Sequence, residues 1–306
     1  MKKRILVTTQ MMIHDQNRFG KWLQEYDFKV DFLMNDQFLN ESDCLQINPV
    51  YSGWIAGDDE ITNKVIDHLI PSLEIISKWG TGIDSIDTKY AKDAGLLVKN
   101  SPGAFGDAVG EIAVAYLLAL SRGILKTHFE VLHGAWPKKQ YIGLNDMSIG
   151  IVGMGAIGQG ILNRLHCFGC KTSYFDPNIE LQTSQKLGFE DLLTKSDAII
   201  VSCELNPTTF QLFNKDAFNM MKSNALFINV SRGPIVKFND LVLALKENMI
   251  AGAALDVYEE EPLPENKDVL DPLNIILGSH NGNNTRSAVE NVHENTILNL
   301  VNFFNV

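Results

Sequence analysis

Residues 148–158 read Ser-Ile-Gly-Ile-Val-Gly-Met-Gly-Ala-Ile-Gly, and this stretch decides the fold. An apolar run of strand length leads directly into a G-x-G-x-x-G pattern, and a helical stripe of apolar residues follows. The first glycine of such a pattern permits a tight turn, the second lets a pyrophosphate approach the backbone, and the third lets the helix pack on the strand. The phosphate then lies at the positive end of the helix dipole. The predicted cofactor-binding residues of this loop are Gly153, Gly155, Ala156, Ile157 and Gly158.

The strand expected next, 172–175, ends at Asp176, eighteen residues after Gly158. A carboxylate at this position can bind both ribose hydroxyls and would repel a 2′-phosphate, and no arginine neighbours it. The pattern therefore predicts NAD rather than NADP. The competing interpretation is a structural Rossmann module without ligand, which NAD would not stabilise against heat.

Apolar runs of strand length alternate with helical patterns along the chain, which predicts parallel sheets built from βαβ units in an α/β fold. The expected strands are 5–8, 29–34, 53–57, 73–78, 96–99, 148–152, 172–175, 198–202, 226–230, 251–255 and 275–277. Helices are expected at 61–69, 88–93 and 108–120, and the last of these is apolar on all sides, which predicts that it is buried. A further helix is expected after Thr285, which would be its N-cap. Because the glycine pattern lies in mid-sequence, we expect one domain to be inserted into another that both chain ends build.

Length and charge limit the possible partners. The 306 residues predict about two domains, and the formal net charge of −11 disfavours nucleic acid and membrane surfaces. The apolar run after the basic start ends at Val7, which is shorter than the ~7 residues of an export signal, so a cytoplasmic location is expected.

The four cysteines, Cys44, Cys167, Cys170 and Cys203, are too few and too scattered for a disulfide framework. Cys167 and Cys170 form a C-x-x-C pattern, which could be redox-active or half of a metal site, but no second pair accompanies them. We expect them to be packing residues, and no metal site is predicted.

Three polar groups follow apolar strands, at the place where ligands bind in open α/β sheets: Arg232, Glu261 and His280. Hydride transfer to a 2-keto acid needs a cation for the carboxylate, and arginine offers a bidentate fork. It also needs an acid–base group near neutrality, for which histidine is suited, and a carboxylate that favours the protonated imidazole. Taken singly, each residue is more often a surface salt bridge or a solvated polar group; their combination predicts a catalytic site.

The sequence resembles the D-isomer-specific 2-hydroxyacid dehydrogenases over nearly its whole length, and most nearly the phosphoglycerate-dehydrogenase-like members. The motifs that carry the resemblance are Lys-Trp-Gly-Thr-Gly-Ile-Asp at 78–84, Asn-Ser-Pro-Gly at 100–103, Gly110-Glu111, and the segments 143–158, 229–233 and 251–262. The resemblance implies a Rossmann NAD-binding domain at 101–279. It also implies a flavodoxin-like substrate domain from 1–100 and 280–306, a homodimer, and a small 2-hydroxy or 2-keto acid as substrate.

The resemblance also assigns residues. Arg232, Glu261 and His280 match the family's catalytic residues, and Asp256 matches its contact on the nicotinamide side. The backbone amides of Thr81 and Gly82 would bind the substrate carboxylate. The implied substrate-binding set is Trp79, Gly80, Thr81 and Gly82, and the further cofactor-binding set is Cys203, Pro207, Val230, Ser231, Asp256 and Gly282.

Some positions depart from the family pattern. Ser279 stands where proline usually precedes the histidine, Asn281 follows it in place of a small or apolar residue, and 202–204 read Ser-Cys-Glu where the family often has His-x-Pro. Residues 56–60 read Ala-Gly-Asp-Asp-Glu, where phosphoglycerate dehydrogenases carry a basic residue, so a phosphorylated substrate would be repelled. Lys78 could supply the missing positive charge for a phosphate, but an exposed lysine at a strand end is the favoured interpretation.

Alternative functions remain open from the sequence. One is a glyoxylate or hydroxypyruvate reductase, and another is an NAD-sensing binding protein like the corepressors that share this fold. A formate-dehydrogenase-like reaction is disfavoured because that branch has glutamine where this chain has Glu261. Trp79 either narrows the substrate pocket or packs in the core.

Overall fold

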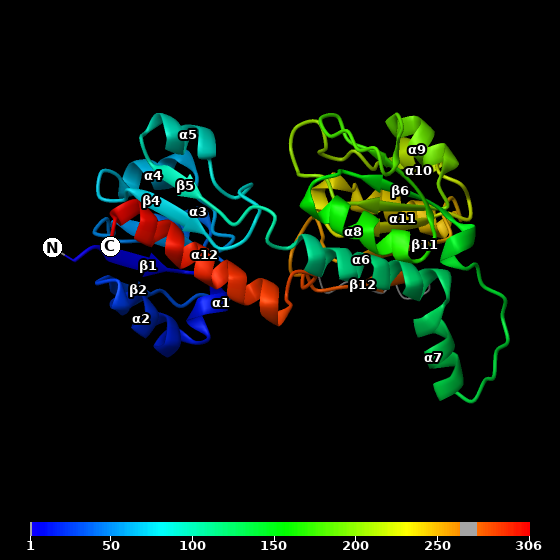
Figure 1. The fold of residues 1–306 in the computed structure, drawn as a ribbon, viewed down its shortest axis with the longest axis horizontal. Coiled ribbons are helices and arrows are strands. Elements are labelled where there is room, and N and C mark those ends of the chain that lie inside the picture. Colours follow the sequence, from blue (N-terminus) through cyan, green and yellow to red (C-terminus); the bar gives the residue numbers. More distant parts are fainter. Residues whose placement is uncertain (1, 264–273) are drawn as a thin grey trace. The chain divides into compact units, whose positions relative to one another are not determined.

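The computed structural model describes residues 2–263 and 274–306. The chain forms two compact units: unit 1 contains Met1–Ala104 and Arg286–Val306, and unit 2 contains Phe105–Thr285. Each unit is a sheet flanked by helices (Figure 1). The predicted boundaries, at 100 and 280, lie a few residues before those of the units, so His280 and Gly282 belong to unit 2 rather than to the segment from the C-terminal end.

The described part of unit 1 holds a five-stranded parallel sheet with the order β2-β1-β3-β4-β5, which is the flavodoxin-like order. Its strands are β1 (Arg4–Val7), β2 (Lys29–Phe32), β3 (Gly53–Ala56), β4 (Ile75–Lys78) and β5 (Leu97–Lys99). Its helices are α1 (Gln10–Ile13), α2 (Gln16–Glu25), α3 (Glu41–Cys44), α4 (Asn63–Leu69), α5 (Thr88–Asp93) and α12 (Arg286–Phe304).

Helix α12 completes the core of unit 1, although it comes from the far end of the chain (Figure 1). It begins directly after Thr285, the predicted cap, and buries Val292, Ile297 and Leu300. A Cβ atom on Gly53 of β3 would lie only 3.2 Å from Cδ2 of Leu300, so this glycine lets the helix approach the sheet closely. Unit 1 is therefore built from both ends of the sequence, as predicted.

The described part of unit 2 holds a seven-stranded parallel sheet with the order β12-β11-β10-β9-β6-β7-β8. Its strands are β6 (Ser148–Val152), β7 (Lys171–Phe175), β8 (Gln185–Lys186), β9 (Ala198–Val201), β10 (Leu226–Asn229), β11 (Gly252–Leu255) and β12 (Ile275–Leu277). Read from β8, this is the 3-2-1-4-5-6 order of a Rossmann domain with one strand added. The Rossmann prediction is confirmed.

The helices of unit 2 cover this sheet and extend beyond it. They are α6 (Gly106–Ser121), α7 (Ile124–Leu132), α8 (Ala156–Cys167), α9 (Phe189–Lys195), α10 (Lys215–Met220) and α11 (Phe238–Lys246). Helices α6 and α8 cross in backbone contact, because a Cβ atom on Gly160 would lie 2.1 Å from the carbonyl oxygen of Gly106. Helix α6 is buried over much of its surface, as predicted from its composition.

Several details differ from the sequence predictions. The predicted strands tend to run a residue or two too long, because an apolar residue can continue past the last ladder hydrogen bond. The elements that were not predicted are helices α1, α2, α3, α7, α9, α10 and α11 and strand β8. Helix α7 has no buried residue, so no stripe of core contacts marks it. Cys167 is exposed at the end of α8 and does not pack in the core. Within the described residues no single helix is long and apolar enough to cross a membrane; α6 and α7 meet that criterion only as a pair bent by 56°.

Candidate active site

In the glycine loop after β6, two of the three glycines leave no room for a side chain, and the third has open space beside it. Gly153 has a φ of +91°, and a Cβ atom on it would lie 2.4 Å from the backbone nitrogen of Cys203. A Cβ atom on Gly158 would lie 2.2 Å from the carbonyl oxygen of Gly153. At Gly155, by contrast, a Cβ atom would meet nothing within 4 Å. The open side of the loop, at the N-terminus of α8, therefore fits a pyrophosphate group.

Asp176 follows β7 and is held against this loop. Its Oδ2 atom accepts a hydrogen bond from the N–H of Met154 at 2.8 Å, and its Oδ1 atom accepts from Asn178 at 2.8 Å and Ile179 at 2.9 Å. Burial alone would raise the pKa of Asp176, but the three backbone donors outweigh it, so the pKa lies below its ordinary value. The carboxylate is fixed and ionised, which suits it to accept from ribose hydroxyls.

The segment after β9 closes the other side of the glycine loop. The hydroxyl of Ser202 donates to the carbonyl oxygen of Gly153 at 2.8 Å, and the hydroxyl of Ser231 donates to the carbonyl oxygen of Cys203. Burial raises the pKa of the Cys203 thiol to about 12, so this cysteine stays a neutral lining group. Val230 and Ser231 are buried beside it.

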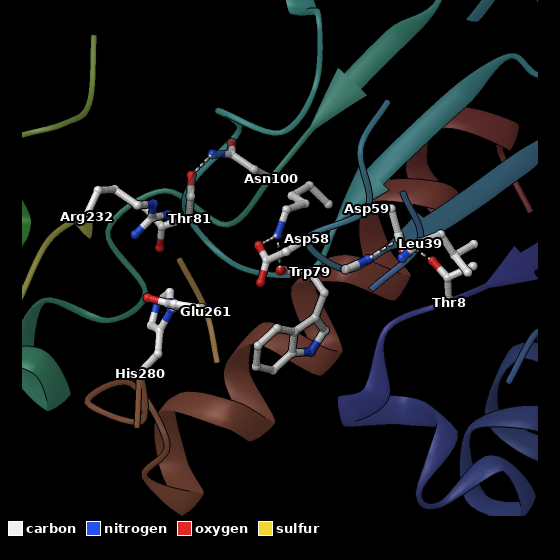
Figure 2. Close-up of polar contacts among 12 residues, drawn as sticks. Thr8, Leu39, Asp58, Asp59, Trp79, Thr81, Asn100, Arg232, Glu261 and His280 are labelled. Atoms are coloured by element: carbon white, nitrogen blue, oxygen red, sulfur yellow. Dashed lines mark hydrogen bonds and ion pairs between the residues drawn. The ribbon is translucent and has the colours of Figure 1, made fainter. Parts of the chain in front are cut away.

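Three neighbouring strands bring the predicted catalytic residues to one edge of the sheet. Asn229 pairs with Leu255 and Leu255 pairs with Leu277, so the carboxyl ends of β10, β11 and β12 are level. Arg232, Glu261 and His280 lie in the segments that follow these three strands. Figure 2 shows the guanidinium of Arg232 together with the carboxylate of Glu261 and the ring of His280.

Glu261 and His280 form a directed pair. Nδ1 of His280 lies 2.7 Å from Oε2 of Glu261, and the other carboxylate oxygen accepts the N–H of Tyr258 at 2.9 Å. Because an ionised carboxylate only accepts hydrogen bonds, we assign the proton of this contact to Nδ1. That tautomer leaves Nε2 as the nitrogen that can exchange a proton with a ligand, on a side chain that is 38% exposed.

The loop that carries His280 is held by Asp256. His280 has a φ of +52°, and its N–H donates to the carbonyl oxygen of Asp256 at 2.7 Å. The carboxylate of Asp256 accepts from the N–H of Gly282 at 2.9 Å and from the hydroxyl of Tyr116 at 3.0 Å. Burial and the nearby Asp256 raise the pKa of Tyr116, which therefore stays a donor. Sequence reasoning placed Asp256 and Gly282 at the cofactor and missed this positioning role, because Tyr116 comes from the distant helix α6.

The turn that carries Arg232 is tied to the segment that carries Glu261. A Cβ atom on Gly233 would lie 1.8 Å from the carbonyl group of Tyr258, so only glycine permits this contact between backbones. Nη1 of Arg232 donates to the carbonyl oxygen of Ser231 at 2.8 Å. The carbonyl oxygen of Arg232 accepts from the side-chain amide of Asn229 at 3.0 Å. The arginine is thus oriented by its own turn.

The predicted substrate loop belongs to unit 1 and follows β4. Gly80 has a φ of +116°, and its carbonyl oxygen accepts the N–H of Ser101 at 2.9 Å. The carbonyl oxygen of Thr81 accepts the amide of Asn100 at 2.5 Å. Trp79 is only 7% exposed, and its indole N–H donates to Nδ1 of His293 in α12 at 3.0 Å. Its side chain packs against α12, which favours the packing interpretation of this residue.

Two further observations concern unit 1. Lys78, expected to be exposed, is buried, because its ammonium group is enclosed by polar partners next to the substrate loop. A pocket of about 540 Å³ lies between the end of β2 and α3, and no predicted site residue lines it. Among the described residues, no group of three or more His, Cys, Asp or Glu side chains could hold a metal ion.

Comparison with known proteins gives consistent matches. The family model described as "D-isomer specific 2-hydroxyacid dehydrogenase, NAD binding domain" matches residues 114–282. A glyoxylate reductase of Thermococcus litoralis is 36% identical over 260 residues, covering 79% of this chain and 78% of the relative. A D-3-phosphoglycerate dehydrogenase of Methanocaldococcus jannaschii is 32% identical over 76% of this chain and 46% of the relative. The crystal structure of the TT0316 protein from Thermus thermophilus superposes with a TM-score of 0.85 at 27% identity, covering 97% of this chain and 96% of the other.

Proposed function

Because the chain belongs to the D-isomer specific 2-hydroxyacid dehydrogenase family, we propose that it is an NAD-dependent reductase of small 2-keto acids, with glyoxylate and hydroxypyruvate as the first candidates. The observation that carries the proposal is the contact of 2.7 Å between Glu261 and His280, at the same sheet edge as Arg232. The relatives named glyoxylate reductase favour this substrate class over a phosphorylated acid.

In the proposed reaction, His280 donates a proton from Nε2 to the ketone oxygen as the alcohol forms, and takes it back in the reverse direction. Glu261 stabilises the imidazolium form, and its hydrogen bond from Tyr258 keeps it from turning away. Arg232 holds the substrate carboxylate and polarises the ketone. When bound, NADH would supply the hydride that the ketone carbon takes up, leaving NAD.

The cofactor is proposed to lie on the open side of Gly155, with Asp176 at the ribose. The remaining cofactor contacts stay predictions: Ala156, Ile157, Cys203, Pro207, Val230, Ser231, Asp256 and Gly282. The amides of Thr81 and Gly82 are proposed to bind the substrate carboxylate, and a cytoplasmic location is proposed as well.

We propose a homodimer that forms through an apolar patch on α7 and the segment after it. The patch consists of Ile124, Leu125, Phe129, Val131, Leu132 and Trp136, all of which are exposed. So many large apolar side chains exposed along one short segment are unusual on a monomer and are typical of an interface. A second copy of the chain would cover it with the same residues across a two-fold axis.

The test of the function follows NADH absorbance with glyoxylate, hydroxypyruvate, phosphohydroxypyruvate, pyruvate and 2-oxoglutarate. Arg232→Ala and His280→Ala should each lower kcat/KM by about 10²–10⁴. NADH binding should persist in both variants, because the glycine loop is held by Asp176 and Ser202. Near-normal turnover in both variants would refute the assignment. Tight NADH binding by the unaltered protein, without turnover of any acid, would indicate an NAD-sensing protein instead.

A further inference from the structure

We propose that Asn295, in helix α12, is a positioning residue that orients the two backbone amides of the substrate loop. The inference rests on the proposed function, in which the N–H groups of Thr81 and Gly82 bind the substrate carboxylate. It concerns unit 1 alone, because this loop and α12 both belong to that unit.

The direction of each amide is set by the carbonyl group that shares its peptide unit. A trans peptide unit is planar, so its C=O and N–H point in opposite directions, and a contact that fixes the oxygen also fixes the N–H. The N–H of Thr81 shares its unit with the carbonyl of Gly80, and the N–H of Gly82 with the carbonyl of Thr81. In the described part of the chain neither N–H donates a hydrogen bond, and Thr81 and Gly82 are partly exposed, so both amides are available to a ligand.

Both of these carbonyl oxygens are held by the segment that follows β5. The N–H of Ser101 donates to the oxygen of Gly80 at 2.9 Å, and the side-chain amide of Asn100 donates to the oxygen of Thr81 at 2.5 Å (Figure 2). The hydroxyl of Thr81 also donates to the carbonyl oxygen of Ser101 at 3.3 Å. The direction of each proposed substrate-binding amide therefore depends on where residues 100 and 101 lie.

Residues 100 and 101 are in turn held by α12. Nδ2 of Asn295 donates to Oγ of Ser101 at 2.8 Å and to the carbonyl oxygen of Asn100 at 3.4 Å. Nδ2 of Asn299, one turn further along the helix, donates to the same carbonyl oxygen at 3.4 Å. Ser101 is 2% exposed, so its hydrogen bond from Asn295 is shielded from water. Asn295 therefore connects α12 to the residue whose N–H holds the first of the two peptide units.

The residue before the loop is anchored on the same helix. The indole N–H of Trp79 donates to Nδ1 of His293, which lies two residues before Asn295 in α12. The loop thus starts from a fixed residue, and α12 contacts it again through the segment that holds its carbonyl groups. Because the start of the loop stays anchored by His293, loss of the Asn295 side chain should change the direction of the amides without unfolding the loop.

The test replaces Asn295 by alanine, which removes the Nδ2 donor and favours the helix. The substrate carboxylate is bound in the ground state and in the transition state alike, so weaker binding raises KM more than it lowers kcat. The KM for glyoxylate should rise about 5-fold, the effect of one neutral hydrogen bond, while kcat stays within about 2-fold of that of the unaltered protein. The Kd for NADH should not change, because the glycine loop belongs to unit 2.

Ser101→Ala tests whether Asn295 acts through Ser101. This variant removes the hydroxyl that accepts from Asn295 and keeps the N–H that donates to Gly80. In a double-mutant cycle the two substitutions should be non-additive, and the double variant should have the same KM as Asn295→Ala alone. A KM that rises by the product of the two single effects would contradict the connection through Ser101 and overturn the proposal.

Two further variants are controls. Asn291→Ala makes the same substitution one turn earlier on α12, at an exposed position. Ile297→Val, on the buried face of the helix, controls for a loss of stability, which thermal unfolding measures. Both controls should keep the KM of the unaltered protein. An unchanged KM in Asn295→Ala, or an equal rise in either control, overturns the role of Asn295 and leaves the reductase function standing. Absence of turnover of every keto acid by the unaltered protein overturns both.

Discussion

Replacing Gly155 by alanine should weaken cofactor binding while leaving the fold intact. A Cβ atom at this position meets nothing within 4 Å, and the backbone φ of −67° and ψ of −163° are accessible to alanine. The cost to stability is the weaker N-cap, about 0.5–1 kcal/mol, which lowers the melting temperature by a few degrees. The methyl group would stand where the pyrophosphate must approach the backbone. We expect the Kd for NADH to rise about 10–100-fold, equivalent to roughly 1.4–2.8 kcal/mol.

The chain offers a matched control in Gly188. This glycine is also the N-cap of a helix, α9, with φ of −65° and ψ of 156°, and a Cβ atom there likewise meets nothing within 4 Å. Gly188→Ala should lose similar stability and keep wild-type affinity for NADH. Isothermal titration calorimetry and thermal unfolding of the two variants separate the effects. Wild-type affinity in Gly155→Ala would show that the open side of the loop does not receive the cofactor.

Two further predictions concern other parts of the molecule. Burial lowers the pKa of His293 from 6.5 to about 4, so its contribution to stability is complete above pH 6.5 and is lost as the pH falls toward 4. Urea unfolding should show that the free energy of unfolding falls by roughly 2 kcal/mol between pH 7 and 4. The loss should be smaller in His293→Asn, whose side-chain oxygen can accept the Trp79 N–H but does not titrate. The same pH dependence in the variant and the wild type would contradict a buried neutral imidazole. In the α7 patch, Phe129→Asp should convert a dimer to a monomer in sedimentation experiments, and an unchanged mass would place the interface elsewhere.

The parts of the fold that the sequence predicted are those governed by local patterns. The strand and glycine pattern of residues 148–158 appears as β6, its loop and the start of α8, because Gly153 and Gly158 leave no room for a side chain at the turn and at the contact between helix and strand. That Arg232, Glu261 and His280 follow strands ending at one edge of the sheet could be predicted, because parallel strands carry the residues after their ends to the same edge.

The parts that could not be predicted depend on contacts between distant segments. Lys78 looked like an exposed strand-end lysine, since nothing local shows that Asp58 and the Trp79 carbonyl enclose it. The role of Asp256 in holding the His280 loop depends on Tyr116, which is 140 residues away. Helix α7 could not be predicted from a stripe of core-facing residues, because none of its residues is buried.

The position of α12 sets an order of events during synthesis. The five strands of unit 1 leave the ribosome first, but the helix that covers them is translated only after all of unit 2. Unit 2 is one continuous segment and can fold as soon as it emerges. Until α12 has been added, unit 1 lacks the buried side chains that this helix contributes, so its core is complete only after the whole of unit 2 has been made.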